Sequence, residues 1–202
     1  MPQAALADLQ QPLDTTAAAI LDAARAAVLD FGVRRATLSE IASRAGVSRM
    51  TVYNRFGDLD AVVRALMTRE FGSRIQWIAR EREWVHGRER LIALLVRAAR
   101  QLPANPLFRK VRSSEPELLA PYVFERLGAT QQLALELIES GIADGQRDGS
   151  IRAGETGRIA AAALLMVQSF VFSAATIDTL PIDELLQELQ LALEGLLAPQ
   201  EA

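Results

Sequence analysis

The stretch IASRAGVSRMTVYNRFG, residues 41–57, contains the residue types that most clearly indicate a binding chemistry. It holds three arginines and no acidic residue, although the chain of 202 residues carries a formal net charge of −3. Thr51, Tyr53 and Asn54 lie between the arginines. Proteins use guanidinium, hydroxyl and amide groups together to bind phosphates and base edges. The stretch therefore predicts a contact surface for nucleic acid.

The charge around this stretch is locally concentrated. Residues 32–56 contain five Arg and one Glu, a balance of 5 − 1 = +4, so the rest of the chain carries −3 − 4 = −7. Such asymmetry directs one end of a molecule toward a polyanion, while the acidic remainder limits non-specific binding. Basic helix faces are often merely solvated, so a helical adaptor protein without DNA binding remains an alternative.

Two short helices are expected to position these side chains. Thr37 and Glu40 form a T-x-x-E capping box at the start of the first helix, and the exposed amides there suit an anion. Gly46 supplies the turn, and Ser48 caps the second helix. A small residue, Ala42, stands where the two helices meet. This pattern predicts a helix-turn-helix.

A helical wheel assigns the faces of the second helix. With Val52 pointing inward, Met50 and Asn54 point outward. Asn54 suits an adenine edge, and Met50 suits a thymine methyl group. Arg49, in the first turn, is expected to reach a guanine or a phosphate. The hydroxyl groups that flank this face suit phosphates and fix the register on DNA.

Residues 15–67, TTAAAILDAARAAVLDFGVRRATLSEIASRAGVSRMTVYNRFGDLDAVVRALM, resemble the tetracycline-repressor (TetR) family of bacterial transcription regulators. The resemblance implies an all-α homodimer that binds double-stranded DNA at a palindromic operator, with two recognition helices about 34–36 Å apart. It implies an N-terminal three-helix helix-turn-helix domain and a larger C-terminal helical domain for ligand sensing and dimerisation. The expected DNA-contacting residues, which include the two caps, are Thr37, Ser39, Ser48, Arg49, Met50, Thr51, Tyr53, Asn54 and Arg55.

One position departs from the family pattern. A lysine often begins the helix after YNRF in this family and contacts a phosphate, whereas this chain has Leu59. Only backbone amides beside Asp58 are then expected to serve that phosphate. The expected organisation is a flexible arm over 1–13, the DNA-binding domain over 14–58 and the ligand-binding and dimerisation domain over 59–202. The arm lacks the basic start of a secretion signal, which predicts a cytoplasmic protein.

Helical periodicity and Gly and Pro positions predict the remaining elements. The expected helices begin near Thr16 and stop at Gly32, run from near Asp58 past Trp77, cover about 88–101, 107–113, 117–146 and 159–177, and follow Pro181.

Two of these helices are expected to form the dimer. Residues 159–177 are uncharged and long enough to span a membrane, but they include polar residues and lack a flanking basic cluster. Burial in a four-helix bundle formed by two copies explains them without a membrane. The last helix has a heptad seam suited to such packing. The expected dimerisation residues are Leu164, Val167, Val171, Ile182, Leu186, Leu189, Leu193 and Leu196.

The middle helices are expected to hold a sensor pocket for a small apolar or amphipathic effector. The candidate lining residues are Trp84, Phe108, Arg112, Tyr122, Phe124, Met166, Gln168 and Phe170, with Glu115 and Phe172 also considered. Plain core packing is the alternative for each aromatic residue.

Catalytic, metal and cofactor chemistry are not expected. The chain has no cysteine, and its one histidine, His86, suits a surface or capping position. The usual zinc ligand sets and the phosphate-binding and hydrolase motifs are missing. The sequence thus favours a ligand-responsive repressor, with a regulator that needs no effector as the alternative.

Overall fold

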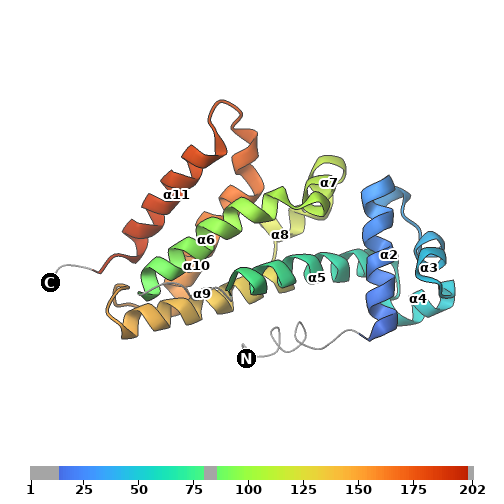
Figure 1. Ribbon diagram of the computed structural model, residues 1–202, viewed down its shortest axis with the longest axis horizontal. Helices are drawn as coiled ribbons and strands as arrows, with labels where there is room; N and C mark the ends of the chain where they lie inside the picture. Colours follow the sequence, from blue (N-terminus) through green and yellow to red (C-terminus); the bar gives the residue numbers. More distant parts are fainter. Residues whose placement is uncertain (1–13, 80–85, 200–202) are drawn as a thin grey trace. The chain divides into compact units, whose positions relative to one another are not determined.

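The computed structural model describes residues 14–79 and 86–199, which form helices and no strand (Figure 1). The first elements are α2 Thr15–Phe31, the 3₁₀ turn η1 Val33–Arg35, α3 Leu38–Ala45, α4 Arg49–Phe56 and α5 Leu59–Ala79. The rest are α6 Gly87–Ala104, α7 Pro106–Ser114, η2 Pro116–Leu118, α8 Ala120–Phe124, α9 Ala129–Arg147, α10 Thr156–Ser173, η3 Ala174–Thr176 and α11 Ile182–Leu197. The predicted all-α class is confirmed, and the predicted arm lies outside the described residues.

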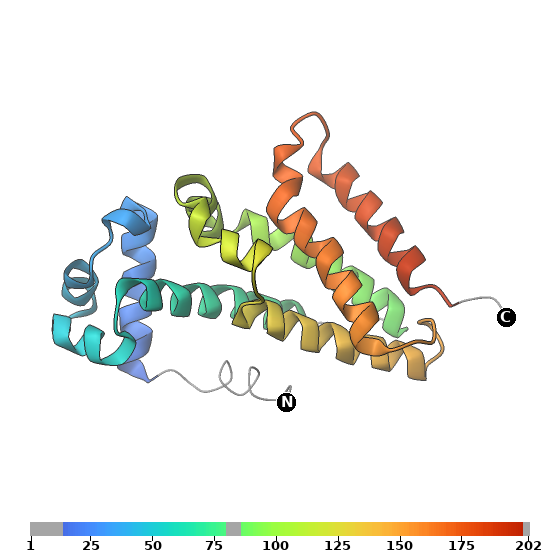
Figure 2. The same cartoon turned by 180° about the vertical axis from the view of Figure 1, so that it is seen from behind.

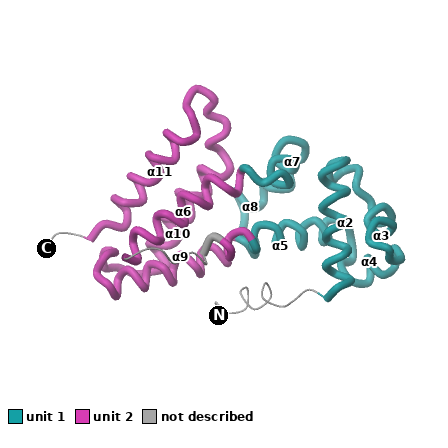
Figure 3. Tube along the Cα trace, in the orientation of Figure 1, with its two compact units in different colours: residues 1–73, 104–130 teal, residues 74–103, 131–202 magenta. Residues whose placement is uncertain are grey.

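The chain divides into two compact units (Figure 3). Unit 1 comprises residues 1–73 and 104–130, and unit 2 comprises 74–103 and 131–202. These units do not coincide with the predicted division at residue 58, because the first part of α5 belongs to unit 1 and α7 packs on α2 there. The functional division at residue 58 stays a prediction.

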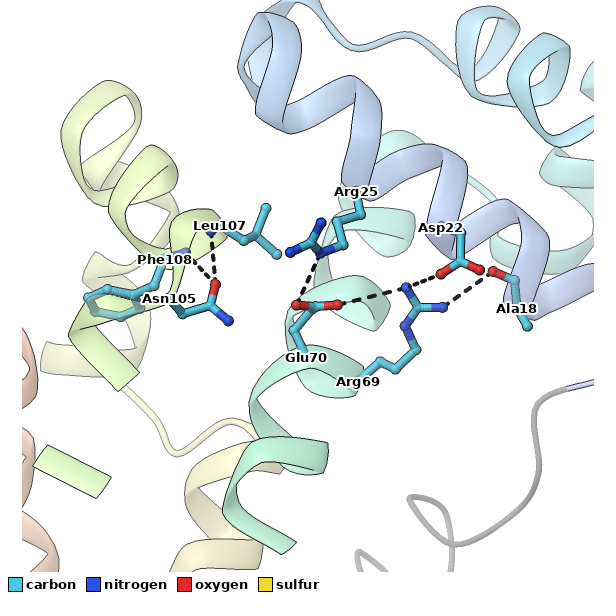
Figure 4. Close-up of polar contacts among 8 residues, drawn as sticks. All are labelled: Ala18, Asp22, Arg25, Arg69, Glu70, Asn105, Leu107 and Phe108. Atoms are coloured by element: carbon cyan, nitrogen blue, oxygen red, sulfur yellow. Dashed lines mark hydrogen bonds and ion pairs between the residues drawn. The ribbon is translucent and has the colours of Figure 1, made fainter. Parts of the chain in front are cut away.

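Within unit 1, polar and aromatic contacts join α2, α5 and α7. Figure 4 shows Arg25 of α2 beside Glu70 of α5, with 3.3 Å between Nε and Oε2. Arg69 pairs with Asp22 at 2.8 Å. Partly exposed pairs contribute at most about 1 kcal/mol each, so they orient the helices more than they stabilise them. The ring of Phe71 meets Phe108 of α7 edge to face, with centroids 5.7 Å apart.

Two helix boundaries differ from the sequence prediction. Asp14, rather than Thr16, caps α2, because its carboxylate accepts a hydrogen bond from Ala17 N at 2.8 Å. The predicted helix 117–146 is wrong, since the chain forms η2, α8 and α9 there. The backbone leaves the helix at Glu125, whose φ is −121°, and α9 begins only at Ala129. The predicted stop at Gly32 is confirmed, with φ of 83° after the last residue of α2.

In unit 2, α10 and α11 lie side by side as an antiparallel pair (Figure 2). The seam between them is made within one chain. The predicted dimerisation residues that are buried in this seam or around it are Leu164, Val167, Val171, Leu186, Leu189 and Leu193. These side chains are at most 7% exposed within one chain, and their assignment as dimer contacts stays a prediction. An apolar heptad pattern packs equally well within a chain and between chains.

The remaining two predicted dimer contacts differ from these six. Ile182 is exposed, and Leu196 is partly exposed, while its neighbour Leu197 is fully buried. By length and composition alone, α10 with η3 is apolar enough to cross a membrane, with a mean hydropathy of 1.8. In the structure, one face of α10 packs on α11, and 39% of this apolar stretch is buried.

The start of α6 contacts the end of α9 at two glycines. A Cβ atom on Gly87 would lie 2.8 Å from Cα of Gly145, so the two backbones touch. Asp148 accepts hydrogen bonds from Gly87 N at 2.8 Å and from Ser150 N at 2.9 Å. The turn after α9 therefore supplies the N-terminal cap of α6. Exposed His86 stands just before this helix start.

Asp148 should make stability depend on acid pH. The Ser150 hydroxyl and the backbone N–H groups of Gly87 and Ser150 lower the pKa of Asp148 from 3.8 to about 2. A lowered folded-state pKa contributes stability that is complete above 3.8 and is lost as pH falls toward 2. We expect Asp148→Asn to lower the melting temperature at pH 7 and to lose that difference between pH 5 and pH 2, by calorimetry.

A control replacement is Asp178→Asn, in the exposed turn between η3 and α11. The melting temperature of this variant should follow that of the native chain across the same pH range. A constant Asp148→Asn deficit down to pH 2 would contradict the assigned role of the carboxylate.

Candidate nucleic-acid interface

The pair α3 and α4 closes around a left-handed turn at Gly46. Its φ of 68° and ψ of 28° suit glycine, and its N–H bonds to the last turn of α3. Val47 N donates to Ala42 O at 3.0 Å, which satisfies a second carbonyl at the helix end. Ala42 and Val52 are buried where the helices meet, at 3% and 0% exposure. The predicted helix-turn-helix geometry is confirmed.

Hydroxyl caps fix the starts of both helices. Thr37 Oγ1 accepts from Glu40 N at 3.1 Å, and Ser48 Oγ accepts from Thr51 N at 3.0 Å. The reciprocal half of the predicted capping box is different, because the Glu40 carboxylate accepts from Arg44 Nε at 2.7 Å. The hydroxyls of Ser48 and Thr51 also bond each other at 2.9 Å. Both caps are therefore already hydrogen-bonded on the surface predicted to meet DNA.

The outward face of α4 presents the predicted side chains. Met50 is 62% exposed and Tyr53 is 58% exposed. Arg49 and Asn54 are exposed as well. Within residues 14–79 and 86–199, no hydrogen bond or ion pair engages the side chains of Arg49, Tyr53 or Asn54. This face thus offers a cation, an amide, a phenol and an apolar contact on one rigid helix.

Arg44 makes its contacts inside the head, which is the group of helices α2, α3 and α4, rather than on this outward face. Its guanidinium bonds Glu40 on the same helix and Asp30 of α2, each at 2.7 Å, and lies 5.2 Å from the ring centre of Phe31. The hydrogen bonds to Glu40 and Asp30 raise the pKa of Arg44. Arg44 thereby holds α3 against the end of α2.

Two further arginines are also paired. Arg55, predicted to contact DNA, forms an ion pair with Asp14 at the cap of α2. Arg34 of η1 pairs with Glu117 of η2, and this contact raises the pKa of Arg34. Arg55 consequently positions the end of α4 against the start of α2, and its role in DNA contact stays a prediction.

These pairs reduce the net charge expected for the interface. The sequence interval 32–56 has a net charge of +4. Three acidic residues from outside the interval form ion pairs with its arginines, which leaves 4 − 3 = +1. The three acids are Asp14, Asp30 and Glu117. Sequence analysis missed them because no local pattern links residues 14 to 83 positions apart. In the described part of the chain, Arg35 and Arg49 are the arginines of this interval without an acidic partner.

The N-terminus of α5 is capped by an acid. Asp58 Oδ1 accepts a hydrogen bond from Ala61 N at 2.7 Å. A carboxylate thus occupies one of the backbone amides expected to serve a phosphate here, and the phosphate contact itself stays a prediction. Asp58 and the uncharged Leu59 together make this helix start less favourable for a phosphate than a lysine would.

The predicted sensor residues fall into different environments. Trp84 lies outside the described residues. Phe108 is buried core at 3% exposure, as the plain packing alternative expects, whereas Phe124 is 83% exposed. The partly exposed residues are Arg112 and Tyr122 in unit 1 and Met166, Gln168 and Phe170 in unit 2.

A groove of about 380 Å³ lies between α6 and α11 in unit 2, and none of the predicted sensor residues lines it. Its residues are Val96, Arg100, Asp183, Leu186, Gln187 and Gln190. The Nε2 atom of Gln168 is buried without a hydrogen-bond partner among the described residues. The predicted pocket as a set remains a prediction.

A capped helix pair that presents one polar, partly apolar face on a helical body defines the class of helix-turn-helix DNA-binding regulators. Residues 20–66 match the model of the bacterial regulatory proteins, tetR family. HTH-type transcriptional regulators of Mycobacterium tuberculosis and Mycobacterium bovis are 38% identical over 183 residues, 90% of this chain and 94% of each relative. The chain belongs to the tetR family of transcriptional regulators, which are not enzymes.

Solved structures show the same fold at low identity. The transcriptional repressor QsdR of R. erythropolis aligns with a TM-score of 0.69 at 14% identity, over 95% of this chain and 99% of that chain. The fatty acid degradation regulator FadR from Bacillus halodurans aligns at 0.66 with 21% identity, over 91% and 96%. FadR from Bacillus subtilis, solved with stearoyl-CoA, aligns at 0.63 with 18% identity, over 87% and 96%.

The start of α5 should respond to added positive charge. We expect Leu59→Lys to strengthen binding to a cognate duplex and to steepen the slope of log K against log salt by about 0.9, because one more phosphate is neutralised. Asp58→Asn should also strengthen binding, since asparagine retains the cap without the negative charge. Fluorescence anisotropy at several salt concentrations measures both.

Leu59→Met is the matched control for Leu59→Lys, because it alters the side chain without adding charge. It should leave the slope unchanged. A Leu59→Lys slope equal to that of the native chain would show that the start of α5 lies away from the DNA backbone.

Proposed function

We propose that the chain is a cytoplasmic repressor that binds a palindromic operator as a homodimer and is released by a small apolar or amphipathic effector. The observation that supports this most is the outward face of α4, where Arg49, Tyr53 and Asn54 have no partner in the described chain and Met50 is 62% exposed. A soluble helix exposes such a set at little benefit unless another molecule covers it. Major-groove base edges and phosphates match these groups.

Repression is supported by relatives in fold. QsdR is a transcriptional repressor, and NalD of Pseudomonas aeruginosa is a secondary repressor of a multidrug efflux pump. Both are similar to this chain in fold alone, so repression comes to this chain as part of the proposal.

The effector class has similar support. Bacillus subtilis FadR was solved with stearoyl-CoA, which is amphipathic, and SmeT with triclosan, which is largely apolar. Such an effector can release DNA only by binding one dimer geometry more tightly than the other. A regulator that needs no effector is the second candidate. The observation that favours it is that the seven sensor candidates in the described part of the chain are distributed over both units and do not form one group within either unit.

The proposed dimer surface includes the exposed faces of α10 and α11. The exposed positions on α10 include Ala161, Leu165 and Ser169, and those on α11 include Leu191, Ala192 and Gly195. Leu165 is 65% exposed and Leu191 is 59% exposed. Small residues around each leucine allow helices of a second copy to approach closely. Two helices from each copy then form the proposed four-helix bundle.

Introducing positive charge on these faces should separate the dimer. We expect Leu165→Arg with Leu191→Arg to give a folded monomer in analytical ultracentrifugation, because two buried arginines on each side of the interface would lack partners. Phe124→Arg, at a more exposed apolar residue on α8, is the control and should leave the dimer intact. A dimer that persists in the double variant would locate the interface elsewhere.

Operator selection tests the function directly. From a random duplex pool at near-physiological salt, the native chain should recover an inverted repeat. Arg49→Ala should weaken binding to the recovered duplex by about 1–3 kcal/mol, and Tyr53→Phe by about 1 kcal/mol, with unchanged melting temperatures. Arg109→Ala removes an exposed arginine from α7 and should have no comparable effect.

The outcomes separate the candidates. Folded native protein that enriches no sequence would favour the helical adaptor. With a repeat in hand, release by acyl-CoA or triclosan would support the effector class, and unaltered binding in their presence would favour the effector-independent regulator.

A further inference from the structure

Glu115 is the most deeply buried charged residue of the described chain. It ends α7, and 3% of its surface is exposed. One carboxylate oxygen, Oε1, accepts a hydrogen bond from the backbone N–H of Arg34 at 3.2 Å. The other, Oε2, is buried with no hydrogen-bond partner among the described residues. An unsatisfied buried carboxylate oxygen destabilises a fold, so the presence of a glutamate at this buried position has to be explained by something other than stability.

The carboxylate contacts the segment that leads into the helix-turn-helix. Arg34 lies in the η1 turn, between the end of α2 and the cap of α3. At Gly32, a Cβ atom would lie 3.0 Å from Oε1 of Glu115, so the missing side chain makes room for the carboxylate. Gly32 also has φ of 83°, which other residues rarely adopt. Glu115 therefore rests against the main chain of the turn itself.

A second contact lies beside the first. Glu117 of η2 pairs with the guanidinium of Arg34, while Glu115 binds the N–H of the same residue. The Glu117 pair is exposed and contributes little by itself. Lys110 and Ser114 of α7 also approach Gly32, each 3.9 Å from the position of the absent Cβ. The end of α7 and the start of η2 thus surround the turn η1.

We infer that Glu115 is a positioning residue that fixes the helix-turn-helix relative to α7 through the turn η1. All the atoms involved belong to unit 1. α3 follows η1 after two residues, so a shift of the turn displaces α3 and, through the Gly46 turn, α4. The inference rests on the proposed function only in naming DNA as what α4 reads.

A distance measurement in the free protein tests the positioning. The chain has no cysteine, so cysteines introduced at Ser43 of α3 and Arg109 of α7, both exposed, carry the only spin labels. Labelled chain is mixed with an excess of unlabelled chain, so that a labelled copy pairs with an unlabelled one in the proposed dimer. Electron–electron double resonance should then give one narrow distance distribution for the native background. Glu115→Met should broaden or shift it, because methionine fills a similar volume but accepts no hydrogen bond from Arg34. Glu115→Gln should keep it, since the amide oxygen still accepts.

Glu117→Gln is the matched control, because it weakens the exposed pair and leaves the buried contact. It should leave the distribution narrow. A Glu115→Met distribution that superimposes on the native one would overturn the inference. If Glu115→Met does not fold, Glu115→Ala removes the acceptor without adding atoms, and the same two outcomes apply to it.

In unlabelled protein, Glu115→Met should lower the affinity for DNA without lowering the thermal stability. Replacing a buried charge by an apolar group of similar volume is often neutral or stabilising. Glu115→Met should therefore melt no lower than the native chain, yet bind the selected duplex about tenfold more weakly, with Glu115→Gln restoring the affinity. A merely structural role would lower melting temperature and affinity together and would overturn the inference. Should the native chain bind no duplex, the proposed function fails, and the distance measurement still decides the role of Glu115.

Discussion

The contact surface of this regulator depends on how closely α3 and α4 approach each other. That approach requires a left-handed residue at Gly46 and a small side chain at Ala42, with Val52 filling the space between the helices. A larger residue at 42 would force the pair apart, and any side chain at 46 would strain the turn. Because α4 is only eight residues long, it has too few turns to hold its own conformation in water. Its outward face is ordered by the packing of its inward face.

The arginines around this helix pair have two different roles. Arg44 and Arg55 connect α3 and α4 to α2, so the paired cations fix the head rather than reach for DNA. Arg49 remains without an acidic partner among the described residues, on the face with Asn54. The net charge of +1 predicts weak long-range attraction, so in the proposed function close contacts of the α4 face carry most of the recognition.

Local signals in the sequence were sufficient to predict the head. The caps at Thr37 and Ser48, the glycine stops and the inward position of Val52 all depend on residues within one or two turns of each other. Contacts between distant segments were not predictable, because nothing in the sequence near Arg34 indicates that Glu115 and Glu117 meet it. The leucines of α11 show a different limit. Their spacing specifies an apolar seam but not which helix fills it, and α10 of the same chain does so.

The acid at the start of α5 is consistent with this low charge. Non-specific binding arises almost entirely from phosphate contacts, so each contact that is left out weakens attachment to every sequence in the genome. Contacts to base edges, when they are specific, lower the affinity only for sequences that lack the matching bases. A regulator with Asp58 and Leu59 in place of a phosphate-binding lysine therefore gives up total affinity but is less often held at competing sites. Under the proposed function, its occupancy of an operator depends on the fit of α4, and we infer that the turn at Gly46 and the contact of Glu115 with η1 both set that fit.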